Sequence, residues 1–125
     1  MKLSLEGKIA IVTGGSKGIG RATALALAEE GVNLAICARG MADLENTANE
    51  IRSKTGQKVL AVQADTGKPD DIKKLVATTV TELGGIDFLI NNAVNSRAAA
   101  FMDLEDEDWL NHINVKVMGL SLIHI

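Results

Sequence analysis

The 125-residue chain contains no tyrosine, one cysteine, one proline, two phenylalanines and one tryptophan. The single cysteine, Cys37, excludes an internal disulfide and a zinc site built on cysteines. No apolar run approaches the roughly 20 residues of a membrane-spanning helix. Charged residues near the start, among them Glu6 and Lys8, argue against a secretory signal. We therefore expect a cytoplasmic protein with no membrane partner.

The charges are nearly balanced, with 13 Lys and Arg against 16 Asp and Glu and a net charge of −3. This mildly acidic balance argues against nucleic acid as a partner. Two histidines leave little for metal chemistry, so we expect no metal site. Because 46% of the residues are hydrophobic, the chain can fill a core. Its length fits one small domain or a piece of a larger one.

Short apolar runs alternate with helical patterns along the chain. The runs, which suit strands buried on both faces of a parallel sheet, are residues 9–12, 34–37, 59–62 and 86–90. Helices are predicted for residues 18–30 and 41–54, from Pro69 onward, and from near Asp106 onward, where Trp109 is expected to pack. This alternation predicts an α/β fold, either a doubly wound parallel sheet or part of a barrel.

The strongest local signal is the segment Thr13-Gly14-Gly15-Ser16-Lys17-Gly18-Ile19-Gly20, between the first predicted strand and helix. Glycines at this place permit a tight turn and let a phosphate approach the backbone. The N–H groups that begin the following helix then face the anion. The alternative interpretation is a plain turn from strand to helix, which the position after an amino-terminal buried strand disfavours.

This segment resembles the cofactor loop of the short-chain dehydrogenase/reductases. Three further matches follow in the family's order: Asp65 after the third strand, Asn91-Asn92-Ala93 after the fourth, and Asn114 in the last helix. The resemblance covers about residues 5–119. It departs from the family pattern at Val94, where the family has glycine.

The resemblance implies a Rossmann-type doubly wound sheet with strand order 3-2-1-4. It implies that Asp65 binds the adenine, and that Asn114 is the catalytic-site residue that supports a lysine through a water molecule. The cofactor-binding residues it implies are Gly14, Ser16, Lys17, Gly18, Ile19, Gly20, Arg39, Asp65, Thr66, Asn91 and Ala93.

The second strand is followed by Arg39 and Gly40, with no acid at the place where NAD-binding sites hold the ribose 2′-hydroxyl. Arg39 can clamp a 2′-phosphate, and Lys17 adds a second positive charge. This pair resembles the NADP(H)-preferring members of the family. We therefore expect NADP(H) as the preferred cofactor, with NAD(H) as the second choice. The alternative is that both are solvated surface charges.

The family's chemistry uses a tyrosine to move the proton, a lysine four residues later to lower its pKa, and a serine to orient the carbonyl. A chain without tyrosine cannot supply that motif. We therefore interpret residues 1–119 as the amino-terminal part of a dinucleotide-binding domain. Residues 120–125 match a translated library-preparation adapter, which predicts a non-native tail, the alternative being a genuine helix end.

The complete protein is expected to be an NADP(H)-dependent oxidoreductase, and the 3-oxoacyl-thioester reductases are the subgroup it looks most like. Its substrate would be a small carbonyl or alcohol compound, and it would form a homo-oligomer, a tetramer or a dimer. The 125-residue chain alone is expected to be inactive and poorly soluble. Two alternatives stay open: a nucleotide-binding module without chemistry, and a non-functional fragment.

Overall fold

The computed structural model describes residues 3–93 and 101–114. The predicted order of strands and helices is confirmed, with ends that differ by a few residues. The strands are β1 (Ile9–Thr13), β2 (Asn33–Ala38), β3 (Val59–Gln63) and β4 (Phe88–Ile90). The helices are α1 (Gly18–Glu29), α2 (Met41–Thr55), α3 (Pro69–Leu83), the short 3₁₀ helix η1 (Phe101–Asp103) and α4 (Asp106–Ile113). The predictions about Val94 and residues 120–125 lie outside the described residues.

The four strands form one parallel sheet in the order β3-β2-β1-β4, which confirms the order predicted from the resemblance. Ile11 of β1 lies opposite Ala35 of β2 on one side and Leu89 of β4 on the other. The chain therefore leaves β1 in one direction and returns to its other side with β4. A barrel would keep the strands in sequence order, so the described sheet is of the doubly wound type.

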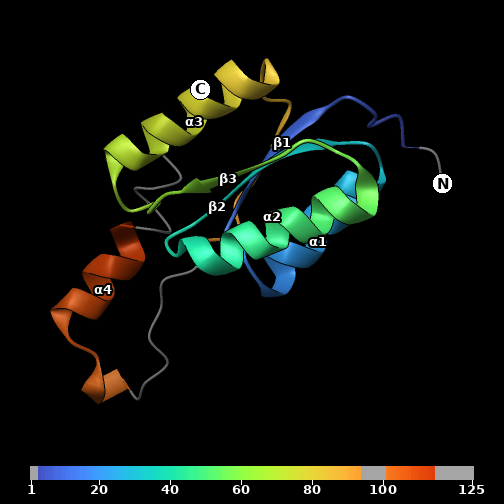
Figure 1. The fold of residues 1–125 in the computed structure, drawn as a ribbon. Helices are drawn as coiled ribbons and strands as arrows, with labels where there is room; N and C mark the ends of the chain where they lie inside the picture. The colour runs from blue at the N-terminus through green and yellow to red at the C-terminus, as the bar shows by residue number, and fades with distance from the viewer. Residues whose placement is uncertain (1–2, 94–100, 115–125) are drawn as a thin grey trace.

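Helices cover both faces of the sheet, as Figure 1 shows, with α1 and α2 on one face and α3 on the other. The first face buries Val12 and Ile36 against α1 and α2, including Leu44. The opposite face buries Ile11 and Leu75 together. Alternate residues of one strand thus serve two cores, which explains why the strands read as continuous apolar runs.

The prediction that the strands are buried on both faces is confirmed for the central strands and is wrong for the outer ones. β1 and β2 are buried almost throughout, whereas all three residues of β4 are half-buried. Outer strands have fewer neighbours, so their side chains stay partly accessible. β4 also begins at Phe88 rather than residue 86. The Asp87 carboxylate accepts the Ile9 N–H at 2.9 Å, where a strand would offer a carbonyl.

Glycines end the helices where the sequence places them. After α1, the N–H of Gly31 donates to the Ala28 carbonyl at 3.0 Å and the N–H of Val32 to the Leu27 carbonyl at 3.1 Å. This pattern is a Schellman motif, and it needs the left-handed backbone of Gly31, whose φ is +88°.

Within the described ranges, no helix is long and apolar enough to cross a membrane.

Helix α4 stands apart from the two layers (Figure 1). Its start is fixed by a reciprocal capping box between Glu105 and Asp108. Trp109, which the sequence predicts to pack, is 47% exposed, and its neighbour Leu110 is 65% exposed. Since α4 does not lie against the sheet, its apolar face is left largely accessible.

Candidate functional site

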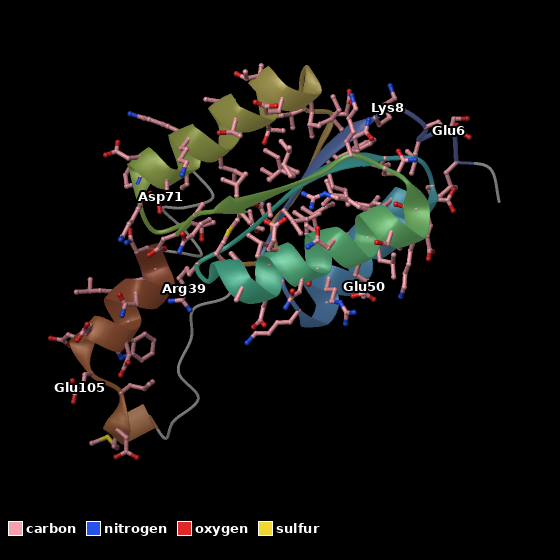
Figure 2. The ribbon with its side chains drawn as sticks, in the orientation of Figure 1. Glu6, Lys8, Arg39, Glu50, Asp71 and Glu105 are labelled. Carbon is pink, nitrogen blue, oxygen red and sulfur yellow. The ribbon has the colours of Figure 1, made fainter. Side chains whose placement is uncertain are left out.

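A cavity of about 480 Å³ opens where the carboxyl ends of all four strands meet. In a doubly wound sheet this edge is the usual place for ligands, because neighbouring loops part there. Figure 2 shows Arg39 and Asp71 at this edge and Glu6 and Lys8 at the opposite one. The cavity is lined by Gly14, Ser16, Lys17, Ile19, Cys37, Ala38, Arg39, Gly40, Asp43, Ala64, Asp65, Thr66, Asn92 and Ala93.

The amino-terminal end of α1 opens into this cavity. Its N-cap residue, Lys17, makes no side-chain capping hydrogen bond, and the first turn holds no acidic residue. The first turns of the other three α-helices in the described chain each contain at least one acid. The first N–H groups of an α-helix have no partner within the helix, and they carry a partial positive charge. This arrangement suits a bound anion such as a phosphate.

Close backbone packing explains why this loop requires glycine. A Cβ on Gly20 would collide with the Gly14 carbonyl oxygen and lie 2.5 Å from Nδ2 of Asn92. A Cβ on Gly15 would lie 2.8 Å from the Ile36 Cβ. Gly14 itself has a φ of +67°, in the left-handed region that favours glycine. The loop is therefore pressed against β2 and the end of β4.

The hydroxyl of Thr13 joins the ends of β1 and β4. Its Oγ1 accepts the N–H groups of Asn92 at 2.9 Å and Ala93 at 3.0 Å. It donates to the Ile90 carbonyl at 3.3 Å, and the residue is 1% exposed. The Asn92 side chain then donates to the Gly14 carbonyl at 3.1 Å. These bonds, which we call the Thr13 clamp, hold the residues after β4 beside the glycine loop.

Two further hydrogen bonds fix the same loop to β2 and α2. The N–H of Gly15 donates to the Cys37 carbonyl at 3.0 Å. The Thr47 hydroxyl donates to the Ser16 carbonyl at 2.8 Å. The glycine loop is thus held by β2, α2 and the residues after β4, which fixes the position of its backbone beside the cavity.

Cys37 lines the cavity but is poorly suited to act as a nucleophile. Burial raises the pKa of its thiol from 9.0 to about 11, although a backbone hydrogen bond from Gly14 acts in the opposite direction. The thiolate is the reactive form of cysteine, so this thiol stays protonated and inert near neutral pH. Cys37 therefore serves as a small apolar residue of the cavity wall.

The cavity wall carries two cations, Lys17 and Arg39, and two carboxylates, Asp43 and Asp65. Asp65 is partly engaged, because its Oδ1 accepts the Gly67 N–H at 2.8 Å in a tight turn. The fixed N–H groups of α1 therefore add to a balanced set of charges. Nowhere in the described ranges do three His, Cys, Asp or Glu side chains form a group that could hold a metal ion.

Most of the predicted cofactor residues come together at this cavity, and their binding role stays a prediction. Gly18 and Gly20 lie in the first turn of α1 and do not line the cavity, and Asn91 is exposed outside it. Asn114 also lies outside the cavity wall and donates to the Gly67 carbonyl at 2.9 Å. The members that line it are Gly14, Ser16, Lys17, Ile19, Arg39, Asp65, Thr66 and Ala93.

Three residues of the site have no role in the sequence-based prediction. Asn92 lines the cavity in place of its neighbour Asn91. Thr13 opens the glycine segment, yet its partners lie 77 to 80 residues away. Asp43 is an acid in the first turn of α2. The sequence could have indicated its place at the site, because it lies only four residues after Arg39.

Known proteins resemble this chain in both fold and sequence. A family model described as short chain dehydrogenase matches residues 8–124. The chain is 38% identical over 114 residues to the 3-oxoacyl-(acyl-carrier-protein) reductase FabG of Staphylococcus epidermidis, covering 90% of this chain. It superposes with a TM-score of 0.93 and 32% identity on the L-sorbose reductase of Gluconobacter frateurii, crystallised with NADPH and L-sorbose, over 98% of this chain. An NAD⁺-bound xylitol dehydrogenase matches with a TM-score of 0.87 and 31% identity over 95% of this chain.

The chain spans about half the length of these relatives: 46% of the Staphylococcus reductase and of the xylitol dehydrogenase, and 47% of the sorbose reductase. The match nevertheless extends over nearly all of the present sequence. The strand order, the glycine loop at the end of β1 and the family match agree with one another. The chain therefore belongs to the short-chain dehydrogenase family of oxidoreductases.

Proposed function

We propose that the chain carries the dinucleotide-binding part of an NADP(H)-dependent oxidoreductase. The complete enzyme would transfer hydride between the nicotinamide and a small carbonyl or alcohol substrate. The observation that supports this most directly is the uncapped amino-terminal end of α1, which opens with Lys17 and Arg39 into one cavity. The names of the relatives add support, since two are reductases of a 3-oxoacyl group and of L-sorbose and one is a dehydrogenase of xylitol.

The cavity fits a dinucleotide in its chemistry. The N–H groups that begin α1 would hold the pyrophosphate, and the close packing of Gly14 and Gly20 leaves the loop backbone free of side chains there. Arg39 and Lys17 would hold a 2′-phosphate, while Asp65 and Thr66 would lie beside the adenine. The chemistry that a bound nicotinamide would supply is hydride transfer, as donor in its reduced form or as acceptor in its oxidised form. Solved relatives carry either NADPH or NAD⁺, so the choice of NADP(H) depends on Arg39 and Lys17.

Substitution of Arg39 tests the cofactor choice. We expect the 125-residue chain to bind NADPH more tightly than NADH, and Arg39→Asp to reverse or flatten that preference, because a carboxylate repels the 2′-phosphate. Dissociation constants from nucleotide fluorescence titrations give the ratio. Arg21→Asp is the matched control, since Arg21 pairs with Glu50 on the helices and lies outside the cavity. An unchanged ratio in Arg39→Asp would refute the NADP(H) preference.

The residues that move the proton would lie outside these 125. In the chemistry that the family resemblance implies, a tyrosine moves the proton, and its phenol of pKa about 10 needs a nearby cation to ionise near neutral pH. The chain holds no tyrosine. We therefore expect the purified chain to bind nucleotide without oxidising NADPH in the presence of 3-oxoacyl thioesters or sugars. Loss of NADPH absorbance measures this directly. Sustained turnover by the pure chain would contradict the proposed division of roles.

A second candidate is a nucleotide-binding module that performs no chemistry, and the absence of tyrosine favours it. The two candidates agree on binding and differ in what the whole protein contains. A natural reading frame that continues into a Tyr-x-x-x-Lys motif supports the enzyme. A natural protein that binds NADPH and lacks that motif supports the binding module.

A further inference from the structure

We propose that Asp43 is a second determinant of cofactor specificity, which opposes Arg39 and lets the site accept NAD(H) as well as NADP(H). The proposal rests on the proposed nucleotide-binding function. It concerns an exposed residue that lines the same cavity as Arg39.

The direction of α2 places Asp43 on the cavity side of that helix. Gly40 is the N-cap of α2, so Asp43 is the third residue of the first turn. Thr47 lies one turn further along the same face, and its hydroxyl donates to the Ser16 carbonyl in the glycine loop. The face that carries Asp43 and Thr47 is therefore turned toward the loop. Figure 2 shows Arg39 at the start of the same helix.

Neither charge is neutralised by a close partner within the described part of the chain. The ion pairs found there join Arg21 and Lys54 to Glu50, and Arg52 to Glu45. Arg39 uses its backbone carbonyl to accept the Gln63 side chain at 2.9 Å, which leaves the guanidinium unused by that contact. Both charges are therefore available to a ligand at the end of β2.

The two cofactors differ at this place by one group. A 2′-phosphate carries a charge of about −1.5 to −2 at pH 7, attracts Arg39 and is repelled by Asp43. A ribose 2′-hydroxyl is uncharged, so it is attracted to a guanidinium less strongly than a phosphate is, and it can donate a hydrogen bond to a carboxylate. Arg39 thus favours NADP(H), and Asp43 favours NAD(H). The balance between them sets the ratio of affinities.

A purely structural role for Asp43 would be to stabilise the helix dipole, as first-turn acids do. That role predicts a change in stability and no change in the ratio of nucleotide affinities. The two roles are separated by comparing ligands that differ only in the 2′-phosphate. Adenosine 2′,5′-bisphosphate and adenosine 5′-monophosphate form such a pair.

The test measures dissociation constants of both nucleotides by calorimetry, using the 125-residue chain and three variants. Asp43→Asn and Asp43→Ser remove the charge and keep a small polar side chain in the first turn. Asp70→Asn is the matched control, because Asp70 is an exposed first-turn acid of α3 that does not line the cavity. We expect both Asp43 variants to bind the bisphosphate about threefold to tenfold more tightly relative to the monophosphate, and Asp70→Asn to leave the ratio unchanged.

The shift should shrink as salt is added, because an exposed carboxylate acts through screened charge. A ratio that stays within about twofold of the parent chain in both Asp43 variants would overturn the proposal while leaving nucleotide binding intact. An equal shift in Asp70→Asn would also overturn it, since the effect would then be nonspecific. If the parent chain binds neither nucleotide, the proposed function fails and the role of Asp43 fails with it.

Discussion

The Thr13 hydroxyl illustrates how one small side chain can shape a site. It accepts two backbone N–H groups after β4 and donates to a third backbone group, while being almost fully buried. Buried backbone donors need partners, and no strand pairing supplies one beyond Ile90, where β4 ends. The hydroxyl therefore replaces sheet hydrogen bonds at the place where the cavity opens.

Replacing Thr13 by valine should break this arrangement. Thr13→Val keeps the shape of the side chain but leaves the N–H groups of Asn92 and Ala93 without their acceptor. We expect a loss of about 1–3 kcal/mol in the free energy of unfolding, measured by urea denaturation, together with weaker NADPH binding. Thr13→Ser keeps the hydroxyl and serves as the control. Equal losses in the two variants would show that packing of the methyl group, not the hydroxyl, carries the effect.

At this scale the sequence predicts the residue types of the site better than their individual roles. The glycine loop was predictable because glycine spacing records backbone contacts that lie close in sequence. The choice between Asn91 and Asn92 was not, because both follow the strand and only the path after Ile90 decides which one faces Gly14. The role of Thr13 was hidden because its partners are 77 to 80 residues away.

Among the elements, the helices were predictable almost to the residue. Their apolar spacing, Pro69 at the start of α3 and Gly31 after α1 are local signals with local causes. The burial of β4 and α4 was not predictable in this way. It depends on which elements lie beside them in space, and the apolar pattern of Phe88–Ile90 or of α4 is the same whether or not a neighbour is present.

Two helix-ending glycines provide a matched test of backbone and contact effects. Gly56 after α2 has a φ of +73° with open space around it, so Gly56→Ala should lose about 1–2 kcal/mol from the left-handed backbone alone. Gly31 has a φ of +88°, and a Cβ there would lie 2.9 Å from Cγ and 3.1 Å from Cα of Glu6. Gly31→Ala should therefore cost about 1–3 kcal/mol more. Urea denaturation measures both, and equal costs would rule out the contact with Glu6.

For the molecule as a whole, two features are left without a covering partner among the described residues: the outer edge of β4 and the exposed apolar side chains Leu110 and Ile113 of α4. The outer side of β4 has no neighbouring strand in the described sheet, and Leu110 and Ile113 of α4 are 65% and 46% exposed. Unpaired strand edges and exposed apolar residues both favour association between molecules.

We expect the 125-residue chain to self-associate in a concentration-dependent way. The double substitution Leu110→Lys and Ile113→Lys should reduce that association, because it replaces apolar surface by like charges, without lowering the melting temperature. Sedimentation velocity measures the association and thermal unfolding measures the stability. Monomeric behaviour of the parent chain at high concentration would contradict this expectation, and a lower melting temperature would show that α4 packs more closely in solution.

The Thr13 clamp also has a consequence for the order of events during folding. Its bonds join side chains to backbone groups of residues up to 80 positions away, so they form only after β4 has reached the side of β1. Contacts of such long sequence separation form late, because the intervening chain must first be ordered. The glycine loop would therefore reach its final position at the last step of assembly. Gain of nucleotide binding during refolding should then lag behind helix formation, and a bound nucleotide would report that the chain has finished folding.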